Sequence, residues 1–233
     1  MMQDKKKLKV IGFDADDTLW INEPYYRETE QQFCLMMEGY CNHEETSARL
    51  FDVETKNMNL YGYGIKAFML SVIETALLIS GGKTGAEQIG KIIELGKTQL
   101  TRINEILPGV RETLLALSAR YRLIVATKGD LLDQEKKLAN SGLLSFFHHI
   151  EIMSDKKPEN YRRLLSHLDI EPEDFMMVGN SIRSDVLPVL EIGGSAVHIP
   201  FHTTWIHEEV PVELLPEKRY IEINTITELL DLF

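Results

Sequence analysis

Apolar and polar residues follow one another along this chain in two rhythms. Short apolar runs bounded by polar or glycine-rich segments are typical of buried strands. These runs span residues 8–13, 121–126, 149–153, 175–178, 196–199 and 220–223. Between them, apolar residues recur at three- and four-residue spacing, which predicts helices over 110–119, 131–140, 160–168 and 182–192. Strands that alternate with helices predict an α/β fold with a parallel sheet and right-handed crossovers.

The segment 23–106 departs from that alternation. Apolar residues keep helical spacing throughout it, and it contains no run that is typical of a strand. Helices are predicted in the stretch that opens with Tyr25 and Tyr26, and over 46–57, 65–79 and 86–100. An all-helical insertion directly after the first strand predicts a separate small domain, 23–106, and a core domain built from 1–22 and 107–233.

Composition narrows the class of protein and its partners. A chain of 233 residues with 44% hydrophobic and 26% charged residues is typical of a soluble globular protein. The net charge of −11 argues against non-specific binding to nucleic acid and to anionic membrane surfaces. Cys34 and Cys41 are the two cysteines, and seven residues apart on one helix they would be too distant for a disulfide. With no signal peptide and no long apolar run, we expect a cytoplasmic protein.

The first strand ends in a cluster of acidic residues. Asp14, Asp16 and Asp17 lie within four positions, followed by Thr18. Carboxylates this close repel one another unless a positive charge lies among them. Mg²⁺ is the usual partner because it prefers carboxylate oxygen. Open α/β sheets bind ligands at the carboxyl ends of their strands, so this end predicts a metal-dependent site.

Two later strands also end in polar residues. Thr127 follows the second strand, where its hydroxyl can donate to a phosphate oxygen. Its neighbour Lys128 is expected to be solvated, and Asp130 to cap the next helix. Lys156 and Lys157 follow the third strand, directly before a proline that suits a first helical turn. A lysine there can point its compact charge back into a carboxylate cluster.

The fourth strand leads into Gly179, Asn180 and, after a short gap, Asp185. Both residues have an oxygen that can ligate Mg²⁺, although the amide of Asn180 is neutral and a weaker ligand than a carboxylate. Taken alone, the segment would rather be a capped loop with Asp185 in a first helical turn. Parallel strands bring their carboxyl ends to one edge of a sheet, so all four strand ends are predicted to meet there.

The four strand ends resemble, in order, the four motifs of the haloacid dehalogenase superfamily of hydrolases. The matching residues are Asp-x-Asp-x-Thr, then Thr, then Lys-Pro, and last Gly-Asn-Ser followed by Asp. The resemblance covers the core segments between residues 8 and 200 and points to the phosphatase-like branch with a helical cap. It implies a Rossmann-like core with the cap inserted between the first two motifs. In that family the cap closes over the catalytic aspartate.

The resemblance also implies residue roles for catalysis and metal binding. Asp14 corresponds to the nucleophile and Asp16 to the general acid and base. Mg²⁺ would be ligated by Asp14, by the backbone carbonyl of Asp16 and by a residue of the last motif. That motif usually begins Gly-Asp, whereas this chain has Asn180, so either Asn180 or Asp185 is expected to be the direct ligand.

Phosphate binding falls, by the same resemblance, on Thr127 and Lys157. The family's lysine directly precedes the proline, which makes Lys157 the match and Lys156 its near rival. The histidines do not form a recognised ligand spacing around a carboxylate and are expected in loops or at strand ends. A cap turn over Tyr61–Gly64 is the first candidate for substrate selection.

The function predicted from these motifs is Mg²⁺-dependent hydrolysis of a small phosphorylated metabolite through an aspartyl-phosphate. A 2-haloacid dehalogenase is the first alternative, although Asp16 and Asp185 argue against it. A phosphomutase would use the same four motifs, and a non-catalytic binding protein with this fold is the third alternative. The sequence specifies neither the particular substrate nor an oligomeric state.

Overall fold

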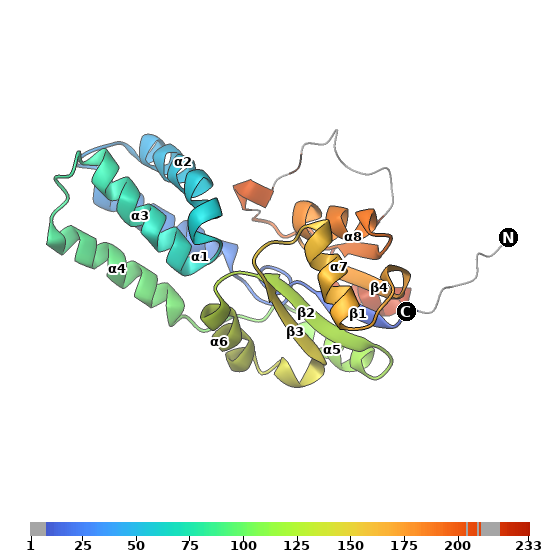
Figure 1. Ribbon diagram of the computed structural model, residues 1–233. Helices are drawn as coiled ribbons and strands as arrows, with labels where there is room; N and C mark the ends of the chain where they lie inside the picture. Colours follow the sequence, from blue (N-terminus) through green and yellow to red (C-terminus); the bar gives the residue numbers. More distant parts are fainter. Residues whose placement is uncertain (1–7, 204, 209, 211–219) are drawn as a thin grey trace. The chain divides into compact units, whose positions relative to one another are not determined.

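The computed structural model describes residues 8–203, 205–208, 210 and 220–233 (Figure 1). The chain divides into two compact units. The core unit consists of Met1–Glu23, Asn104–Lys128 and Leu138–Phe233, and the helical unit consists of Pro24–Ile103 and Gly129–Lys137.

A six-stranded parallel sheet forms the centre of the core unit. Its strands are β1 (Val10–Phe13), β2 (Arg122–Lys128), β3 (His149–Met153), β4 (Phe175–Gly179), β5 (Ser195–His198) and β6 (Ile221–Glu222). They lie in the order β3-β2-β1-β4-β5-β6, so β1 lies between β2 and β4. The predicted α/β class with a Rossmann-like parallel sheet is confirmed.

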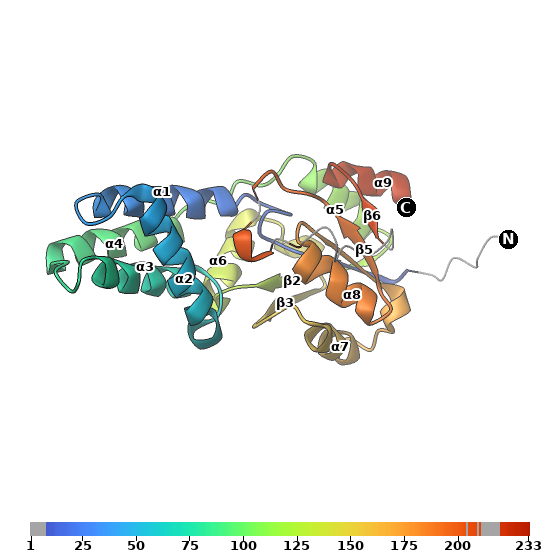
Figure 2. The same ribbon diagram turned by 90° about the horizontal axis from the view of Figure 1, so that it is seen from above.

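Helices cover both faces of this sheet (Figure 2). The helices that lie wholly in the core unit are α5 (Val110–Ser118), α7 (Pro158–His167), α8 (Leu187–Glu191) and α9 (Leu229–Leu232). Helix α6 (Leu131–Ser141) is divided between the two units. On one face Ile11 and Phe13 of β1 pack in a cluster with Leu114 of α5 and Leu229 of α9. On the other face Val10 packs in a second cluster with residues of α7 and α8. A strand buried on both faces explains the nearly continuous apolar sequence of β1.

The predicted helix 182–192 is divided into two parts. A π-helical turn, η3, spans Ile182–Val186, and α8 follows it. Pro188 has no amide hydrogen to donate back to the carbonyl of Ser184, so a regular helix cannot continue through this point. The hydroxyl of Tyr161 donates to that carbonyl instead, at 2.9 Å. The interruption fixes the turn that carries Asp185.

The helical unit is built from α1 (Glu23–Met37), α2 (His43–Tyr61), α3 (Ile65–Ile79) and α4 (Ala86–Leu100). Its apolar cluster includes Phe33 of α1, Leu50 of α2 and Ile92 of α4, which are all fully buried. The bounds predicted for α3 and α4 are confirmed. The second helix begins earlier than predicted because the side chain of Asn42 accepts the amide hydrogen of Glu45 and caps it.

The sequence placed the whole helical insertion at 23–106, and the helical unit also contains Gly129–Lys137, the start of α6. Within this unit Lys66 of α3 forms an ion pair with Asp130 at 2.9 Å. Asp130 also accepts the amide hydrogen of Asp133, as a helix cap does. The thiols of Cys34 and Cys41 are not bonded to each other. None of the helices in the described ranges is long and apolar enough to cross a membrane.

Glu54 of α2 gives the helical unit a pH-dependent stability. Burial raises the pKa of its carboxyl to about 7, the charge of Glu30 acts in the same direction, and Arg27 opposes both. Because the folded state holds this proton more tightly than the unfolded state, the free energy of unfolding decreases as pH rises from about 4.5 to about 7. We expect Glu54→Gln to remove that loss and to be more stable than the wild type by about 1–2 kcal/mol at pH 8 after solvent screening.

Urea denaturation of both proteins at pH 4 and pH 8 measures this effect. The two should be nearly equally stable at pH 4, where the carboxyl is protonated in the folded state and mostly protonated in the unfolded state. Asp52→Asn on the same helix is the matched control because Asp52 is exposed. An equal pH dependence in the Gln variant and the wild type would contradict the prediction.

Candidate active site

The loop after β1 presents Asp14 at the carboxyl end of the central strand. The amide of Asp14 still donates to the carbonyl of Val178 in β4, at 2.8 Å. The chain then turns back tightly, and the amide of Leu19 donates to the carbonyl of Ala15 at 2.8 Å. Asp14 is therefore held by the sheet, and the residues that follow form a compact loop.

Asp17 has a structural function in this loop. Its backbone adopts a left-handed conformation with φ of 61°, which aspartate tolerates better than most residues. Its carboxylate accepts the amide hydrogens of Asn22 at 2.8 Å and of Glu23 at 2.9 Å. These contacts satisfy donors at the start of α1. The third acidic residue of the cluster thus anchors the beginning of the helical insertion.

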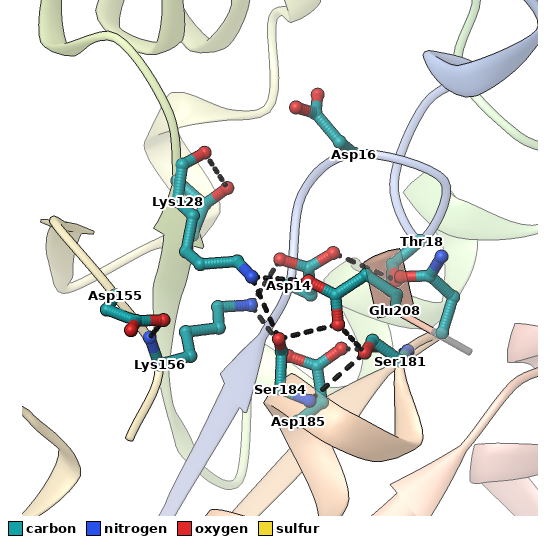
Figure 3. A network of polar contacts seen from close by, with 12 residues as sticks. Asp14, Asp16, Thr18, Lys128, Asp155, Lys156, Ser181, Ser184, Asp185 and Glu208 are labelled. Carbon is teal, nitrogen blue, oxygen red and sulfur yellow. Dashed lines mark hydrogen bonds and ion pairs between the residues drawn. The ribbon is translucent and has the colours of Figure 1, made fainter. Parts of the chain in front are cut away.

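Asp14, Lys156 and Asp185 form a buried ionic cluster at the sheet edge (Figure 3). The ammonium of Lys156 donates to Oδ1 of Asp14, and it lies 2.6 Å from Oδ1 of Asp185. Its side chain is 1% exposed, as is that of Asp185. The backbone amide of Ser181 donates to the other oxygen of Asp185 at 3.0 Å. The three charged groups come from the ends of three different strands.

Burial and the neighbouring charges together determine the protonation of this cluster. Burial raises the pKa of the Asp14 carboxyl to about 7, although the Lys156 ammonium acts in the opposite direction. Burial alone would lower the pKa of Lys156, but the charges of Asp14 and Asp185 raise it above its ordinary value. The lysine is therefore positively charged near neutral pH. Two buried carboxylates share one ammonium, and a further positive charge there would stabilise ionised Asp14.

The expectation that Lys157 would point into the carboxylate cluster is wrong. Its side chain is 62% exposed and pairs with Asp155 at 2.9 Å. Neighbouring residues of an extended segment point to opposite sides, so only one of the two lysines can face the site. The carboxylate of Asp155 accepts the amide hydrogen of Lys156 at 2.8 Å, which holds the backbone in this arrangement. Lys156 is the lysine of this site.

Asn180 and Asp14 present oxygen atoms to a common point. The hydroxyl of Thr18 lies 3.4 Å from Oδ1 of Asn180 and 3.5 Å from Oδ2 of Asp14. Carboxylate and amide oxygens are the ligands that Mg²⁺ prefers. Together with the excess negative charge of the cluster, this donor set fits a divalent cation. Both oxygens of Asp185 already accept hydrogen bonds, from Lys156 and from Ser181.

Asp16 and Thr127 lie at the same strand ends without joining the ionic cluster. Oδ1 of Asp16 accepts a hydrogen bond from the indole of Trp20 at 2.7 Å, and its carboxylate points away from Asp14 (Figure 3). Thr127 is 2% exposed, and its hydroxyl donates to the carbonyl of Lys128 at 3.3 Å. The structure thus brings Asp14, Asn180 and Asp185 together, with Asp16 beside them on the loop after β1 and Thr127 near the end of strand β2.

A second buried ion pair was missed by the sequence analysis. Lys128, expected to be solvated, pairs with Glu208 of the 3-10 turn η4 (Ile206–Glu208). Glu208 also accepts hydrogen bonds from Ser181 and from Ser184, the latter at 2.7 Å. Burial alone would raise the pKa of Glu208, but Lys128 and these hydrogen bonds hold it below its ordinary value. No sequence pattern around Glu208 indicates this contact, because it depends on a loop more than seventy residues from Lys128.

One further group has side chains suited to a metal. His149 and Glu151 of β3 and His167 of α7 bring ligand atoms within 4.8 Å of one another. His149 and Glu151 are already hydrogen bonded at 2.9 Å, and the two imidazole rings pack edge to face. A site with two nitrogen ligands suits zinc-like metals better than Mg²⁺. The oxygen donors around Asp14 remain the ones that fit Mg²⁺.

Gly179 provides the space for Asp185. A Cβ at this position would overlap the Asp185 carboxylate, which Lys156 and Ser181 hold in place. We expect Gly179→Ala to lower the free energy of unfolding by about 2–4 kcal/mol, because neither group can move without breaking buried hydrogen bonds. Chemical denaturation measures the change. Gly90→Ala is the matched control. Gly90 lies within helix α4, and a Cβ at this position would meet no neighbouring atom. The replacement should raise the free energy of unfolding by up to about 1 kcal/mol.

The family model described as haloacid dehalogenase-like hydrolase matches residues 8–193. The chain belongs to this family. This confirms the family prediction made from the four strand-end motifs. As a member of this family, the chain is a hydrolase. A crystal structure of a haloacid dehalogenase-like family hydrolase from Xanthomonas campestris superimposes with a TM-score of 0.82 and 38% identity, over 95% of this chain and 92% of that one.

Two relatives of this haloacid dehalogenase-like hydrolase have phosphatase names. N-acylneuraminate-9-phosphatase of Mus musculus is 28% identical over 96% of this chain and 92% of its own length. Glyceraldehyde 3-phosphate phosphatase of Pyrococcus furiosus is 29% identical over 59% of this chain. The chain spans 57% of the length of that protein.

Proposed function

We propose that this haloacid dehalogenase-like hydrolase is a Mg²⁺-dependent phosphatase that acts on a small phosphorylated metabolite through an aspartyl-phosphate. The observation that carries the proposal is the buried cluster of Asp14, Lys156 and Asp185, in which two carboxylates share one ammonium. This arrangement combines a carboxylate nucleophile with a cation for a phosphoryl oxygen, and its remaining negative charge favours a divalent ion.

In the first step Asp14 attacks phosphorus, and the bond between phosphorus and the leaving oxygen breaks. Asp16 donates its carboxyl proton to that oxygen, and the indole of Trp20 holds the side chain of Asp16 for this transfer. Lys156 and Thr127 stabilise the negative charge on the phosphoryl oxygens. Lys156 takes this role in place of Lys157, which is directed to solvent.

In the second step the Asp16 carboxylate takes a proton from a water molecule, and the oxygen of that water attacks phosphorus. The bond to Asp14 breaks, inorganic phosphate leaves, and both aspartates return to their starting state. Asp14, Asn180 and the backbone carbonyl of Asp16 would hold Mg²⁺, and Asp185 would act through Lys156 and the loop of Ser181. Bound Mg²⁺ supplies charge neutralisation that lets the anionic nucleophile approach an anionic substrate.

Two observations support a small phosphorylated metabolite as the substrate. Of the two named relatives, one is by its name a phosphatase of glyceraldehyde 3-phosphate and the other an N-acylneuraminate-9-phosphatase. The helical unit is inserted in the chain directly after the loop of Asp14, where a cap domain would be expected. We propose that the segment 23–106 acts as this cap and that the turn Tyr61–Gly64, between α2 and α3, contributes to substrate selection.

The 2-haloacid dehalogenase alternative predicts attack on carbon without Mg²⁺. Asp16, Asp185 and the negative charge of the cluster favour the phosphatase. A phosphomutase would share the first step, and a non-catalytic protein would need none of these groups. The alternatives therefore differ in the reaction that they catalyse and in whether that reaction requires Mg²⁺.

Hydrolysis of p-nitrophenyl phosphate with Mg²⁺, and then with EDTA, tests the proposal. Activity that disappears with EDTA and returns with added Mg²⁺ is expected. Release of chloride from 2-chloropropionate, unaffected by EDTA, would instead support the dehalogenase. Absence of both activities from a folded protein, together with no binding of inorganic phosphate, would refute the proposed function.

A further inference from the structure

Lys128, Glu208, Ser181 and Ser184 form a second polar cluster beside Asp14 (Figure 3). The ammonium of Lys128 donates to Glu208 and lies 2.9 Å from the hydroxyl of Ser184. The side chains of Lys128 and Glu208 are 14% and 12% exposed. This cluster involves none of the four groups assigned above to the chemical steps.

The topology of the sheet places this lysine across the end of β1. Lys128 is the last residue of β2, and Ser184 lies in η3 after β4. Because β2 and β4 flank β1, a side chain that joins them crosses the strand end that carries Asp14. Figure 3 shows the ammonium groups of Lys128 and Lys156 directed into the same region beside the Asp14 carboxylate.

The ion pair also needs an explanation other than stability. A buried ion pair usually contributes little net stability, because the loss of hydration offsets the attraction between the charges. Glu208 receives three hydrogen bonds, two of them from serines of the turn that contains Asp185. These contacts hold the Lys128 ammonium at one place without adding net charge to the site.

We propose that Lys128 is a further substrate-binding residue that contacts a phosphoryl oxygen, and that Glu208 is the positioning residue that holds its ammonium across the end of β1. The inference rests on the proposed phosphatase function and assigns two residues to the same site. Glu208 acts on phosphate binding through Lys128, so its effect on phosphate binding should disappear when Lys128 is absent.

Calorimetric titration with inorganic phosphate in the presence of Mg²⁺ tests this assignment. We expect Lys128→Met to weaken phosphate binding by about 10- to 100-fold, as for loss of one charge-assisted hydrogen bond. Glu208→Gln should weaken it by about 3- to 10-fold and raise KM more than it lowers kcat. The double variant Lys128→Met/Glu208→Gln should bind no more weakly than Lys128→Met alone.

Thermal melting of the same variants separates binding from folding. Each single variant leaves one buried charge without its partner and should melt at a lower temperature, whereas the double variant should recover part of this loss. Recovery of melting temperature without recovery of phosphate binding supports the proposal. Lys9→Met removes the lysine of an ion pair with Asp174 at the opposite end of β1 and should not change binding.

Two results would overturn the inference and leave the phosphatase intact. One is phosphate binding by Lys128→Met within twofold of the wild type. The other is a double variant that recovers phosphate binding together with melting temperature, which would make the pair purely structural. Failure of the wild type to bind phosphate and to hydrolyse p-nitrophenyl phosphate would overturn the proposed function itself, and this inference with it.

Discussion

Asp14→Asn is expected to lower kcat for p-nitrophenyl phosphate by about 10⁴- to 10⁶-fold, because loss of a nucleophile removes the covalent route. The replacement has nearly the same shape, and it leaves Lys156 paired with Asp185 at 2.6 Å. The variant should therefore fold and melt at a temperature close to that of the wild type. Single-turnover kinetics with acid quenching should detect a protein-bound phosphoryl group in the wild type and none in the variant.

Asp174→Asn is the matched control for this variant. Asp174 pairs with Lys9 on the surface and precedes β4, at the opposite end of the sheet from Asp14. Its activity should stay within twofold of the wild type. Activity of Asp14→Asn within tenfold of the wild type would show that another group attacks the substrate, and the aspartyl-phosphate route would have to be abandoned.

The second large effect distinguishes two adjacent lysines. Lys156→Met is expected to lower kcat by about 10²- to 10³-fold, because it removes the cation that stabilises the phosphoryl charge. Lys157→Met should change kcat by less than twofold, because this side chain is 62% exposed and its ion pair with Asp155 is on the surface. Steady-state kinetics of both variants at saturating Mg²⁺ measure the difference. Equal losses in the two variants would contradict the assignment.

Stability provides an independent readout of the same pair. Without the Lys156 ammonium, Asp14 and Asp185 face each other as buried carboxylates, which should cost about 3–5 kcal/mol in the presence of EDTA. Added Mg²⁺ should recover part of this loss, since it binds the folded state and compensates the same charges. The melting temperature of Lys156→Met should therefore rise more with Mg²⁺ than that of the wild type or of Lys157→Met.

The fold and much of the candidate site could be predicted from local sequence. The positions of the strands, the helical insertion and the convergence of Asp14, Asn180 and Asp185 follow from apolar periodicity and from the rule that parallel strands end at one edge. The bounds of most strands differ by one or two residues from those predicted, and β2 continues through Thr127 and Lys128. The bounds of α3 and α4 needed no correction: apolar spacing extends over each helix, Gly64 and Gly81 flank α3, and Gly85 directly precedes α4. The strand and helix patterns depend on residues close together in the chain, and the convergence of the strand ends follows once the strands are taken to be parallel.

Contacts between distant segments were not predictable in this way. The choice between Lys156 and Lys157 depends on which side of an extended segment faces the sheet edge. Because the two residues are adjacent and of the same type, the sequence does not show which of them faces it. Lys128 was expected in solvent because its partner Glu208 lies in a loop eighty residues further along the chain. The role of Asp17 as a cap for α1 depends on its left-handed backbone conformation. Nothing in the acidic sequence around Asp17 indicates that conformation.

The sequence by itself determined the family, the α/β class and the four strand ends that carry the chemistry. The reason is that buried strands and helices each require a characteristic spacing of apolar residues, which can be read from the sequence. Only the tertiary structure decided which lysine enters the carboxylate cluster, where Asp16 points and what neutralises Lys128. Those outcomes depend on side-chain direction and on the pairing of buried charges. The strength of such pairing depends on the distance between the charged groups in space. That distance cannot be inferred from their separation along the chain.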